Sequence, residues 1–155
     1  MLFRSSGVGL WPAFWLLGSD IGSAGWPDCG EIDVMEHVGR WPDAILGTLH
    51  GPGYSGANGI SRTVHLGVPA ADAWHDVAIE WDPGRIVWLV DGTPFHEVTA
   101  EAIAPRAWVF DQPFFMLLNV ALGGNLAGAP DPDLVLPAAM LVDHVRLFTR
   151  RSEEH

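Results

Sequence analysis

Apolar stretches along the chain are short, and clusters of Gly, Pro, Asn and Asp separate them. This spacing is typical of β-strands joined by turns. Asp82-Pro83-Gly84-Arg85 and Asp91-Gly92 are turn signals, and residues 99–104 suit a single helical turn. The pattern predicts strands over residues 9–17, 30–39, 44–50, 62–68, 74–81, 86–90, 93–98, 114–122 and 140–149. We therefore expect an all-β sandwich without a helix longer than one turn.

One predicted strand carries three carboxylates in the sequence Glu31-Ile32-Asp33-Val34-Met35-Glu36. Successive side chains of a strand point to opposite faces, so Glu31 and Asp33 share a face and Ile32 lies on the other. On a regular strand Glu36 would point away from Asp33. A β-bulge near Val34-Met35 would return Glu36 to the face of Asp33, and bulges are enriched next to active sites.

The spacing of the two glutamates indicates a type of chemistry. With a bulge, Glu31 and Glu36 are about 13 Å apart at Cα. Side chains that lean toward each other shorten this by about 4 Å each, which leaves about 5 Å between the carboxyl groups. Retaining glycosidases need about 5–5.5 Å, and inverting enzymes need more because a water must fit. Taken alone, the three carboxylates could equally form a charged edge strand that faces solvent.

Composition narrows the classes of function. Of 155 residues, 48% are hydrophobic and 17% charged, which is enough for the core of one domain over residues 1–149, followed by a polar tail at 150–155. The net charge of −11 argues against a protein that binds nucleic acid, and it disfavours anionic polysaccharides as substrates. No apolar run is long enough for a membrane helix, and we interpret residues 8–17 as a strand and not as a signal peptide. A single cysteine, Cys29, excludes an internal disulfide.

The carboxylate strand lies among stretches that resemble glycoside hydrolase family 16, in the branch with a bulged Glu-x-Asp-x-x-Glu strand. The resemblance covers nearly the whole chain and is strongest to β-1,3-glucanases (laminarinases). The matching stretches are residues 9–18 (GLWPAFWLLG), 25–30 (GWPDCG), 47–53 (GTLHGPG), 74–75 (WH), 114–124 and 142–146 (VDHVR). It implies a β-sandwich of the jelly-roll, concanavalin A-like type, with a concave sugar-binding face.

Family domains carry several further strands before the segment that matches residues 9–18. The resemblance thus implies a domain that is short at its N-terminus, with open sheet edges. Three functions follow as hypotheses: a retaining endo-β-glucanase acting on neutral β-1,3 or mixed-linked glucan, a non-catalytic glucan-binding module, or an inactive fragment. Hydrolysis and transglycosylation share the covalent intermediate, so the sequence leaves them open, as it does the oligomeric state. By resemblance the location is extracellular.

The resemblance also implies roles for individual residues. Glu31 resembles the nucleophile, Glu36 the acid/base, and Asp33 a residue that hydrogen-bonds and tunes the nucleophile. No cofactor is needed for this chemistry. We expect the charges of Glu31 and Asp33 to raise the pKa of Glu36. The implied substrate-binding residues are Trp26, His50, Trp11, Trp15, Trp108 and Asn119.

Each binding residue has a structural alternative. Trp26 could stack on a sugar ring or belong to the core. Trp11 and Trp15 share one face, which is either the sugar-binding face or the core. His50 is expected to bind sugar hydroxyls or Glu36, or to be a core histidine. Asn119 interrupts an apolar run and could reach the sugar or hold a loop.

Other chemistry is less well supported by the sequence. Cys29 shares the parity of Glu31 and could lie at the edge of the site, but no activating base is near it in sequence. A zinc site of His50, His75 and Glu31 lacks the usual ligand spacing. Asp143 matches an aspartate that helps bind a structural Ca²⁺ in many family members. Ca²⁺ normally takes six or more oxygen ligands.

Overall fold

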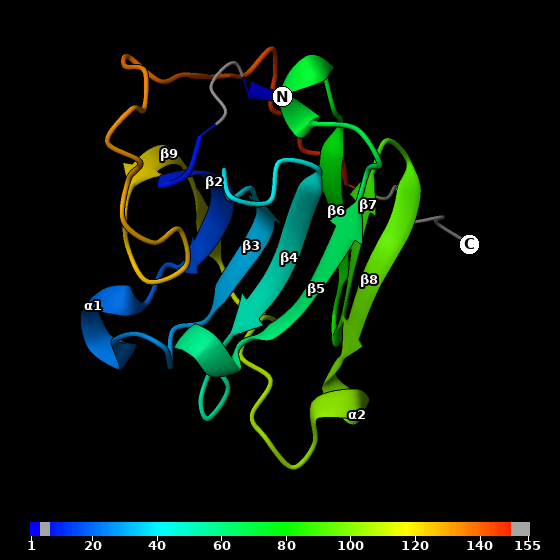
Figure 1. Ribbon diagram of the computed structural model, residues 1–155. Helices are drawn as coiled ribbons and strands as arrows, with labels where there is room; N and C mark the ends of the chain where they lie inside the picture. Colours follow the sequence, from blue (N-terminus) through cyan, green and yellow to red (C-terminus); the bar gives the residue numbers. More distant parts are fainter. Residues whose placement is uncertain (4–6, 150–155) are drawn as a thin grey trace.

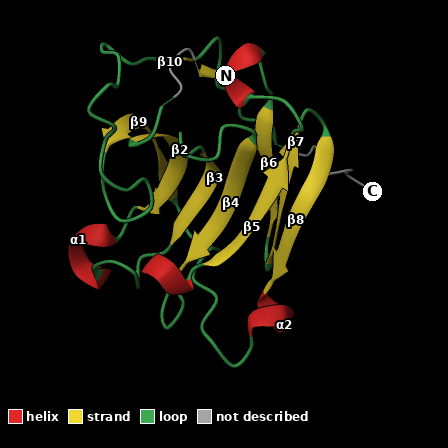
Figure 2. Ribbon diagram, viewed as in Figure 1, coloured by secondary structure: helices red, strands yellow, loops and turns green. Residues whose placement is uncertain are grey.

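The computed structural model describes residues 1–3 and 7–149 and consists mainly of antiparallel strands (Figures 1 and 2). Its helical parts are single turns: α1 (Ile21–Ala24), α2 (Ala100–Ile103) and two 3₁₀ turns at Gly56–Asn58 and Ala70–Asp72. The strands are β1 (Leu2–Phe3), β2 (Leu10–Gly18), β3 (Glu31–Glu36), β4 (Ala44–His50), β5 (Ile60–His65), β6 (Val77–Asp82), β7 (Arg85–Val90), β8 (Thr93–Thr99), β9 (Phe114–Leu122) and β10 (Met140–Leu141).

Two sheets form the layers of the sandwich. The larger has the strand order β5-β4-β3-β2-β9, and the smaller has the order β6-β7-β8. In Figure 1 the strands β3, β4 and β5 run side by side, and β6, β7 and β8 lie on the right of the view. A third pairing joins β1 to β10. The carboxylate strand β3 is therefore the central strand of the larger sheet.

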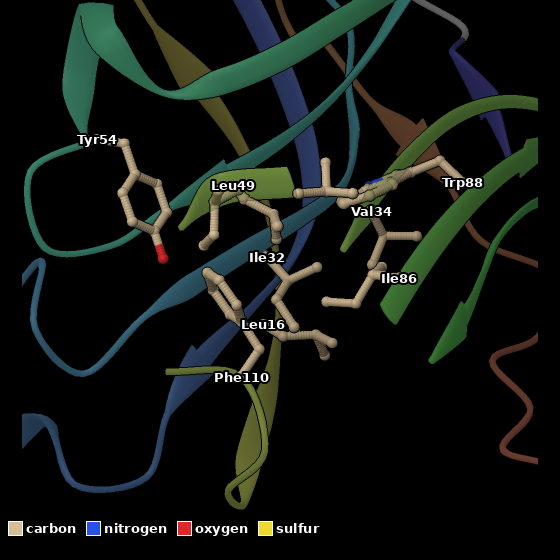
Figure 3. Close-up of a cluster of buried hydrophobic side chains, with 10 residues drawn as sticks. Leu16, Ile32, Val34, Leu49, Tyr54, Ile86, Trp88 and Phe110 are labelled. Atoms are coloured by element: carbon tan, nitrogen blue, oxygen red, sulfur yellow. The ribbon is translucent and has the colours of Figure 1, made fainter. Parts of the chain in front are cut away.

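The core lies between these two sheets (Figure 3). Ile32 and Val34 from β3 pack there with Ile86 and Trp88 from β7. Ile32 is thus buried on the face opposite to its neighbours Glu31 and Asp33, as the alternation predicts. We call the face of the larger sheet that carries Glu31, Asp33 and Glu36 the outer face.

Local signals predicted many elements well. The bounds of β4 and β9 agree with the prediction, and α2 is the expected helical turn, with the Thr99 side chain accepting a hydrogen bond from the Ala102 amide. The β7–β8 hairpin turns at Asp91 and Gly92 with positive φ at both residues, as a type I′ turn requires. The predicted all-β sandwich is confirmed.

The last predicted strand is wrong over most of its length. Only Met140 and Leu141 of the expected strand 140–149 are extended in a ladder, and their partners are Phe3 and Leu2. Residues 142–149 form no strand, and Leu147 and Phe148 are about four-fifths exposed (78% and 81%). A strand exists only where a neighbour accepts its backbone hydrogen bonds, and sequence pattern cannot supply that neighbour.

Smaller differences concern strand ends and short elements. Strand β1 was not predicted, and the single turn α1 lies in a segment predicted as loop. Residues 37–39, 66–68 and 74–76 lie outside the strands to which the pattern assigned them. The predicted polar tail, 150–155, lies outside the described residues. Among the residues described, no helix is long and apolar enough to span a bilayer.

Candidate active site

The predicted bulge is present in β3. Asp33 pairs with Thr48 and Glu36 pairs with Leu46, so Val34 and Met35 together oppose the single residue Gly47. Both Val34 and Met35 are buried in the core. Because the bulge places two consecutive side chains in the core, Glu36 returns to the outer face with Glu31 and Asp33.

The bulge is held from the opposite sheet by a residue that the sequence analysis did not select. The indole Nε1 of Trp88 on β7 donates a 2.8 Å hydrogen bond to the carbonyl oxygen of Asp33. Trp88 is fully buried and lies against Gly47, where an added Cβ would be 2.5 Å from its Cδ1. A glycine inside an apolar strand often marks such a close approach, and this was the available signal.

Glu36 is buried, and both of its carboxyl oxygens are engaged. Trp11 Nε1 donates to Oε1 at 3.1 Å, and the Thr48 hydroxyl donates to Oε2 at 3.0 Å. The Thr48 hydroxyl also lies 3.0 Å from the hydroxyl of Ser61. Burial is the main cause that raises the pKa of Glu36, while the hydrogen bonds from Thr48 and Trp11 oppose it.

The sequence analysis attributed a raised pKa of Glu36 to the charges of Glu31 and Asp33, and this cause is only partly right. Burial comes first, and the negative charge of Glu31 adds a smaller effect. The sequence analysis also missed Thr48 as a partner of Glu36, and Ser61 as a contact of Thr48. The alternation in β4 does place Thr48 on the face of His50, so that periodicity was the signal for Thr48.

Glu31 lies next to the half-exposed Trp26. Trp26 Nε1 donates a 2.8 Å hydrogen bond to Oε2 of Glu31. Burial, followed by the charge of Asp33, raises the pKa of Glu31 to about 7, and His50 and Trp26 partly oppose the shift. Three neighbouring carboxyl groups cannot all ionise easily in a buried place, so the cluster retains a proton near neutral pH.

Asp33 and His50 form the centre of this cluster. The Nε2 atom of His50 lies 3.1 Å from Oδ2 of Asp33 and 3.7 Å from Oε1 of Glu31. Burial, followed by the charge of Glu36, raises the pKa of Asp33 well above its usual range. A side-chain hydrogen bond couples Asp33 to Glu31, as the sequence analysis expected for the residue between the two glutamates.

The expected contact between His50 and Glu36 is not what the structure shows. In the antiparallel ladder His50 is directly opposite Glu31, whereas the partner of Glu36 is Leu46. His50 therefore faces the Glu31–Asp33 end of the cluster. Gly59 lies against its ring, since an added Cβ there would be 2.6 Å from His50 Cε1.

The two tryptophans of β2, Trp11 and Trp15, lie on the outer face. Trp15 is the cross-strand neighbour of Asp33, and its Nε1 donates a 2.7 Å hydrogen bond to Oδ1 of Asn119 on β9. The open choice for Trp11 and Trp15 is thus decided in favour of the outer face. Asn119 is exposed and orients Trp15, so it is not a buried polar residue.

Trp108 is not among the residues gathered around the carboxylates in the described contacts. Its ring packs edge-on against Phe110 with centroids 5.0 Å apart, and its Nε1 donates to Asp111. Trp88 is fully buried in the core, whereas Trp74 is 53% exposed. Tryptophan positions are poorly predicted by sequence because the side chain has both a large apolar surface and a polar N–H.

Two other predicted residues are placed away from a reactive role. Cys29 is fully buried and not at the edge of the site, and burial raises the pKa of its thiol. Asp143 is exposed and contacts the adjacent His144, with Nδ1 and Oδ2 2.9 Å apart. Among the described residues no group of three His, Cys, Asp or Glu ligand atoms includes Asp143. A Ca²⁺ ion takes six or more oxygen ligands, and its binding through Asp143 stays a prediction.

His75 is also separate from the carboxylates. Its Nδ1 lies 2.8 Å from Oδ2 of Asp91 in the β7–β8 turn, and its side chain is buried. This contact gives His75 a structural role at the β7–β8 turn.

Comparison with known proteins gives a consistent assignment. The family model described as "Glycosyl hydrolases family 16" matches residues 2–132. The chain is similar to a "Beta-glucanase" of Rhodothermus marinus, with 42% identity over 92% of this chain and 53% of that protein. It is also similar to "Glucan endo-1,3-beta-glucosidase A1" of Niallia circulans, with 38% identity over 92% of this chain and 22% of that protein.

A solved structure shows the same fold. The endo-beta-1,3-glucanase from Pyrococcus furiosus superposes with a TM-score of 0.85 and 50% sequence identity. The match covers 88% of this chain and 54% of the other. The chain thus spans about half the length of that enzyme and of the Rhodothermus protein.

Proposed function

Since the chain belongs to glycosyl hydrolases family 16, we propose that it cleaves β-1,3-linked or mixed β-1,3/1,4-linked glucan internally, with retention of configuration. The observation that carries this proposal is the bulge in β3, because it brings Glu31, Asp33 and Glu36 to one face of the sheet. The net charge of −11 favours a neutral polysaccharide over an anionic one.

In the proposed first step, a carboxylate oxygen of Glu31 attacks the anomeric carbon. The glycosidic C–O bond breaks, an ester bond to Glu31 forms, and the proton of Glu36 passes to the leaving oxygen. In the second step water attacks the same carbon, Glu36 takes the proton of this water, and Glu31 leaves as a carboxylate. The separation of about 5 Å between the two carboxyl groups stays a prediction of this mechanism.

The protonation states of the cluster support these roles. Burial keeps the pKa of Glu36 raised, which favours the protonated form that an acid needs. Glu31 must be ionised to attack, and it accepts the Trp26 hydrogen bond that favours its charged form. Burial raises the pKa of Asp33 well above its usual range, and a hydrogen bond couples Asp33 to Glu31, so the group of carboxyls as a whole retains a proton.

The outer face also offers groups for binding sugar. Trp26 is 49% exposed, and its ring centroid lies 6.0 Å from that of His50. An exposed aromatic face next to the nucleophile suits the apolar face of a pyranose ring. Trp15 lies on the neighbouring strand β2, opposite Asp33, and the hydrogen bond to Asn119 orients its ring. We assign sugar contacts to Trp26, His50, Trp11, Trp15 and Asn119.

The test compares products from laminarin, lichenan and agarose. We expect oligosaccharides from laminarin, and we expect the first product observed by NMR to be the β-anomer. Glu31→Gln and Glu36→Gln should each lower kcat by roughly 10²–10⁴-fold. Glu80→Gln, which changes an exposed glutamate of β6, is the matched control and should leave kcat unchanged.

The alternatives give different results in the same experiment. Binding of laminarin without cleavage would identify a glucan-binding module. The absence of both, together with a non-cooperative thermal transition, would identify an inactive fragment. The proposal includes an extracellular location, because a polymeric glucan is degraded where it is encountered; fractionation of cells and medium with an antibody tests this.

A further inference from the structure

The side chains of Glu31, Asp33 and His50 each present a ligand atom, and these three atoms lie within 4.8 Å of one another. We infer that they form a binding site for a single transition-metal cation of the Zn²⁺ type, and that the bound cation blocks glucan cleavage. The blocking effect rests on the proposed function. The binding site itself does not.

The distances within the cluster suit such a cation. Zn²⁺ bound tetrahedrally at about 2.0–2.1 Å has ligand atoms roughly 3.3 Å from one another. The Nε2 atom of His50 is 3.1 Å from Oδ2 of Asp33 and 3.7 Å from Oε1 of Glu31. One distance is slightly shorter and the other slightly longer than this separation. For these two pairs, shifts of a few tenths of an ångström are enough to reach coordination, and the ligand atoms of Glu31 and Asp33 lie within 4.8 Å of each other.

The strands fix this arrangement before any cation arrives. Glu31 and His50 are direct partners in the β3–β4 ladder, and Asp33 is two residues along β3 on the same face. Gly59 confines the His50 ring on its other side. The three ligands consequently come from rigid neighbouring strands and not from a flexible loop.

A second observation points to a missing partner at the centre of the cluster. The Asp33 side chain is only 5% exposed, and its Oδ2 atom is buried without a hydrogen-bond donor, although it faces His50 Nε2. A carboxylate oxygen and an unprotonated imidazole nitrogen both present lone pairs, so a positive species between them is favourable. A metal cation bound to both atoms would fill this role.

The donor set selects the kind of cation. One imidazole nitrogen and two carboxylate oxygens suit Zn²⁺ and its neighbours, whereas Ca²⁺ and Mg²⁺ require more oxygen ligands. Two ionised carboxylates and a neutral histidine also balance the charge of a divalent cation. A cation held there would engage the Glu31 carboxylate, which is then unable to attack the sugar.

The chain contains internal controls for this geometry. His65 with Asp43, His75 with Asp91 and His144 with Asp143 also approach within 2.8–3.1 Å. Within the described part of the chain, however, only His50 belongs to a group of three ligand atoms. A histidine–aspartate contact alone is therefore not what defines the site.

The binding test is calorimetric titration of the full chain with ZnCl₂ at pH 7. We expect one equivalent to bind, with affinity that falls at pH 5.5 because protons compete for the ligands. His50→Gln should weaken this binding at least tenfold, and His65→Gln should not change it. Asp33→Asn, which keeps the side-chain shape, is the second variant if His50→Gln does not fold. Equal binding by the parent and both site variants would mean adventitious surface binding and would overturn the site.

The inhibition test measures laminarin hydrolysis with ZnCl₂, and with MgCl₂ at the same concentration as control. Zn²⁺ should inhibit with a constant equal to its dissociation constant, EDTA should restore the rate, and Mg²⁺ should have no effect. Stoichiometric Zn²⁺ binding without loss of hydrolysis would overturn the inhibitory role. If the chain binds Zn²⁺ through His50 but never hydrolyses laminarin, the proposed function fails and the metal site stands.

Discussion

Strands β3 and β9 belong to the same sheet and both carry apolar side chains on its inner face, yet these side chains have different surroundings. On the inner face of β3, Ile32 and Val34 are buried against β7. On β9 the corresponding face carries Met116, Leu118, Val120 and Leu122, all of which are exposed, at 47%, 44%, 38% and 54%. The register shows that this is the same face, since Met116 is the partner of the core residue Leu16.

The difference between these strands arises from the second layer. The three strands β6-β7-β8 cover the inner face beneath β3 and β4, and Trp88 extends from β7 to the bulge. The side chains of β9 are not covered to the same extent, and residues 142–149 form no strand that could cover them. Hydrophobicity therefore predicts which face would be buried, but burial itself needs a partner layer.

The sharpest test compares a truncation on each strand. Ile32→Ala should lower the free energy of unfolding by about 3 kcal/mol, because it leaves a cavity in a closed core. Leu118→Ala should cost less than about 1 kcal/mol, since much of that side chain is already in water. Urea unfolding of both variants measures the two values. Similar losses at the two positions would contradict the contrast in burial.

A second test changes the contact between the layers at the bulge. Gly47→Ala places a methyl group 2.5 Å from the Trp88 ring, and overpacking of this kind typically costs about 1–3 kcal/mol. Because Trp88 holds the Asp33 carbonyl, we also expect kcat for laminarin to fall while the KM changes less. Thermal unfolding and initial rates measure these effects.

Gly22→Ala is the matched control for this substitution. Gly22 lies in the single turn α1, and an added Cβ there meets no atom within 4 Å. The thermal stability of the Gly22→Ala variant and its initial rates on laminarin should equal those of the parent. A fully active, stable Gly47→Ala variant would show that the close packing of Trp88 does not position the carboxylates.

The last test concerns the dependence of stability on pH. Glu31 has its pKa raised from 4.5 to about 7, so the folded chain binds a proton more tightly than the unfolded chain between these values. This stabilisation is fully present below about pH 4.5 and is lost as the pH rises through about 7. The midpoint of thermal unfolding should thus decrease between pH 5 and pH 8 by about 2–4 °C for each kcal/mol lost.

Variants separate this effect from other titrating groups, such as the buried His37, whose lowered pKa acts in the opposite direction. Glu31→Gln should reduce the dependence on pH. Asp143→Asn should retain it, because Asp143 is exposed and its pKa is lowered by His144. A dependence that is identical in the parent and Glu31→Gln would argue against a buried, protonated cluster.

The sequence predicted much of the active strand because its information is local. Alternation assigns Ile32 and Asp33 to opposite faces, and the need to place Glu36 beside Asp33 requires one extra residue. Turn residues and apolar runs likewise predict the bounds of β4 and β9. These features depend on neighbours in the chain and on the fixed period of a strand.

The tertiary structure decided which distant groups meet. The ladder register places His50 opposite Glu31 and not Glu36, and the opposing sheet supplies the Trp88 hydrogen bond to Asp33. The burial of Asp33 and the exposure of Met116 depend on the layer that covers each face. The sequence alone determined the strand, its bulge and the face of its carboxylates. Only the packing of strands far apart in the chain decided their partners and protonation, because desolvation and register are properties of the assembled sheets.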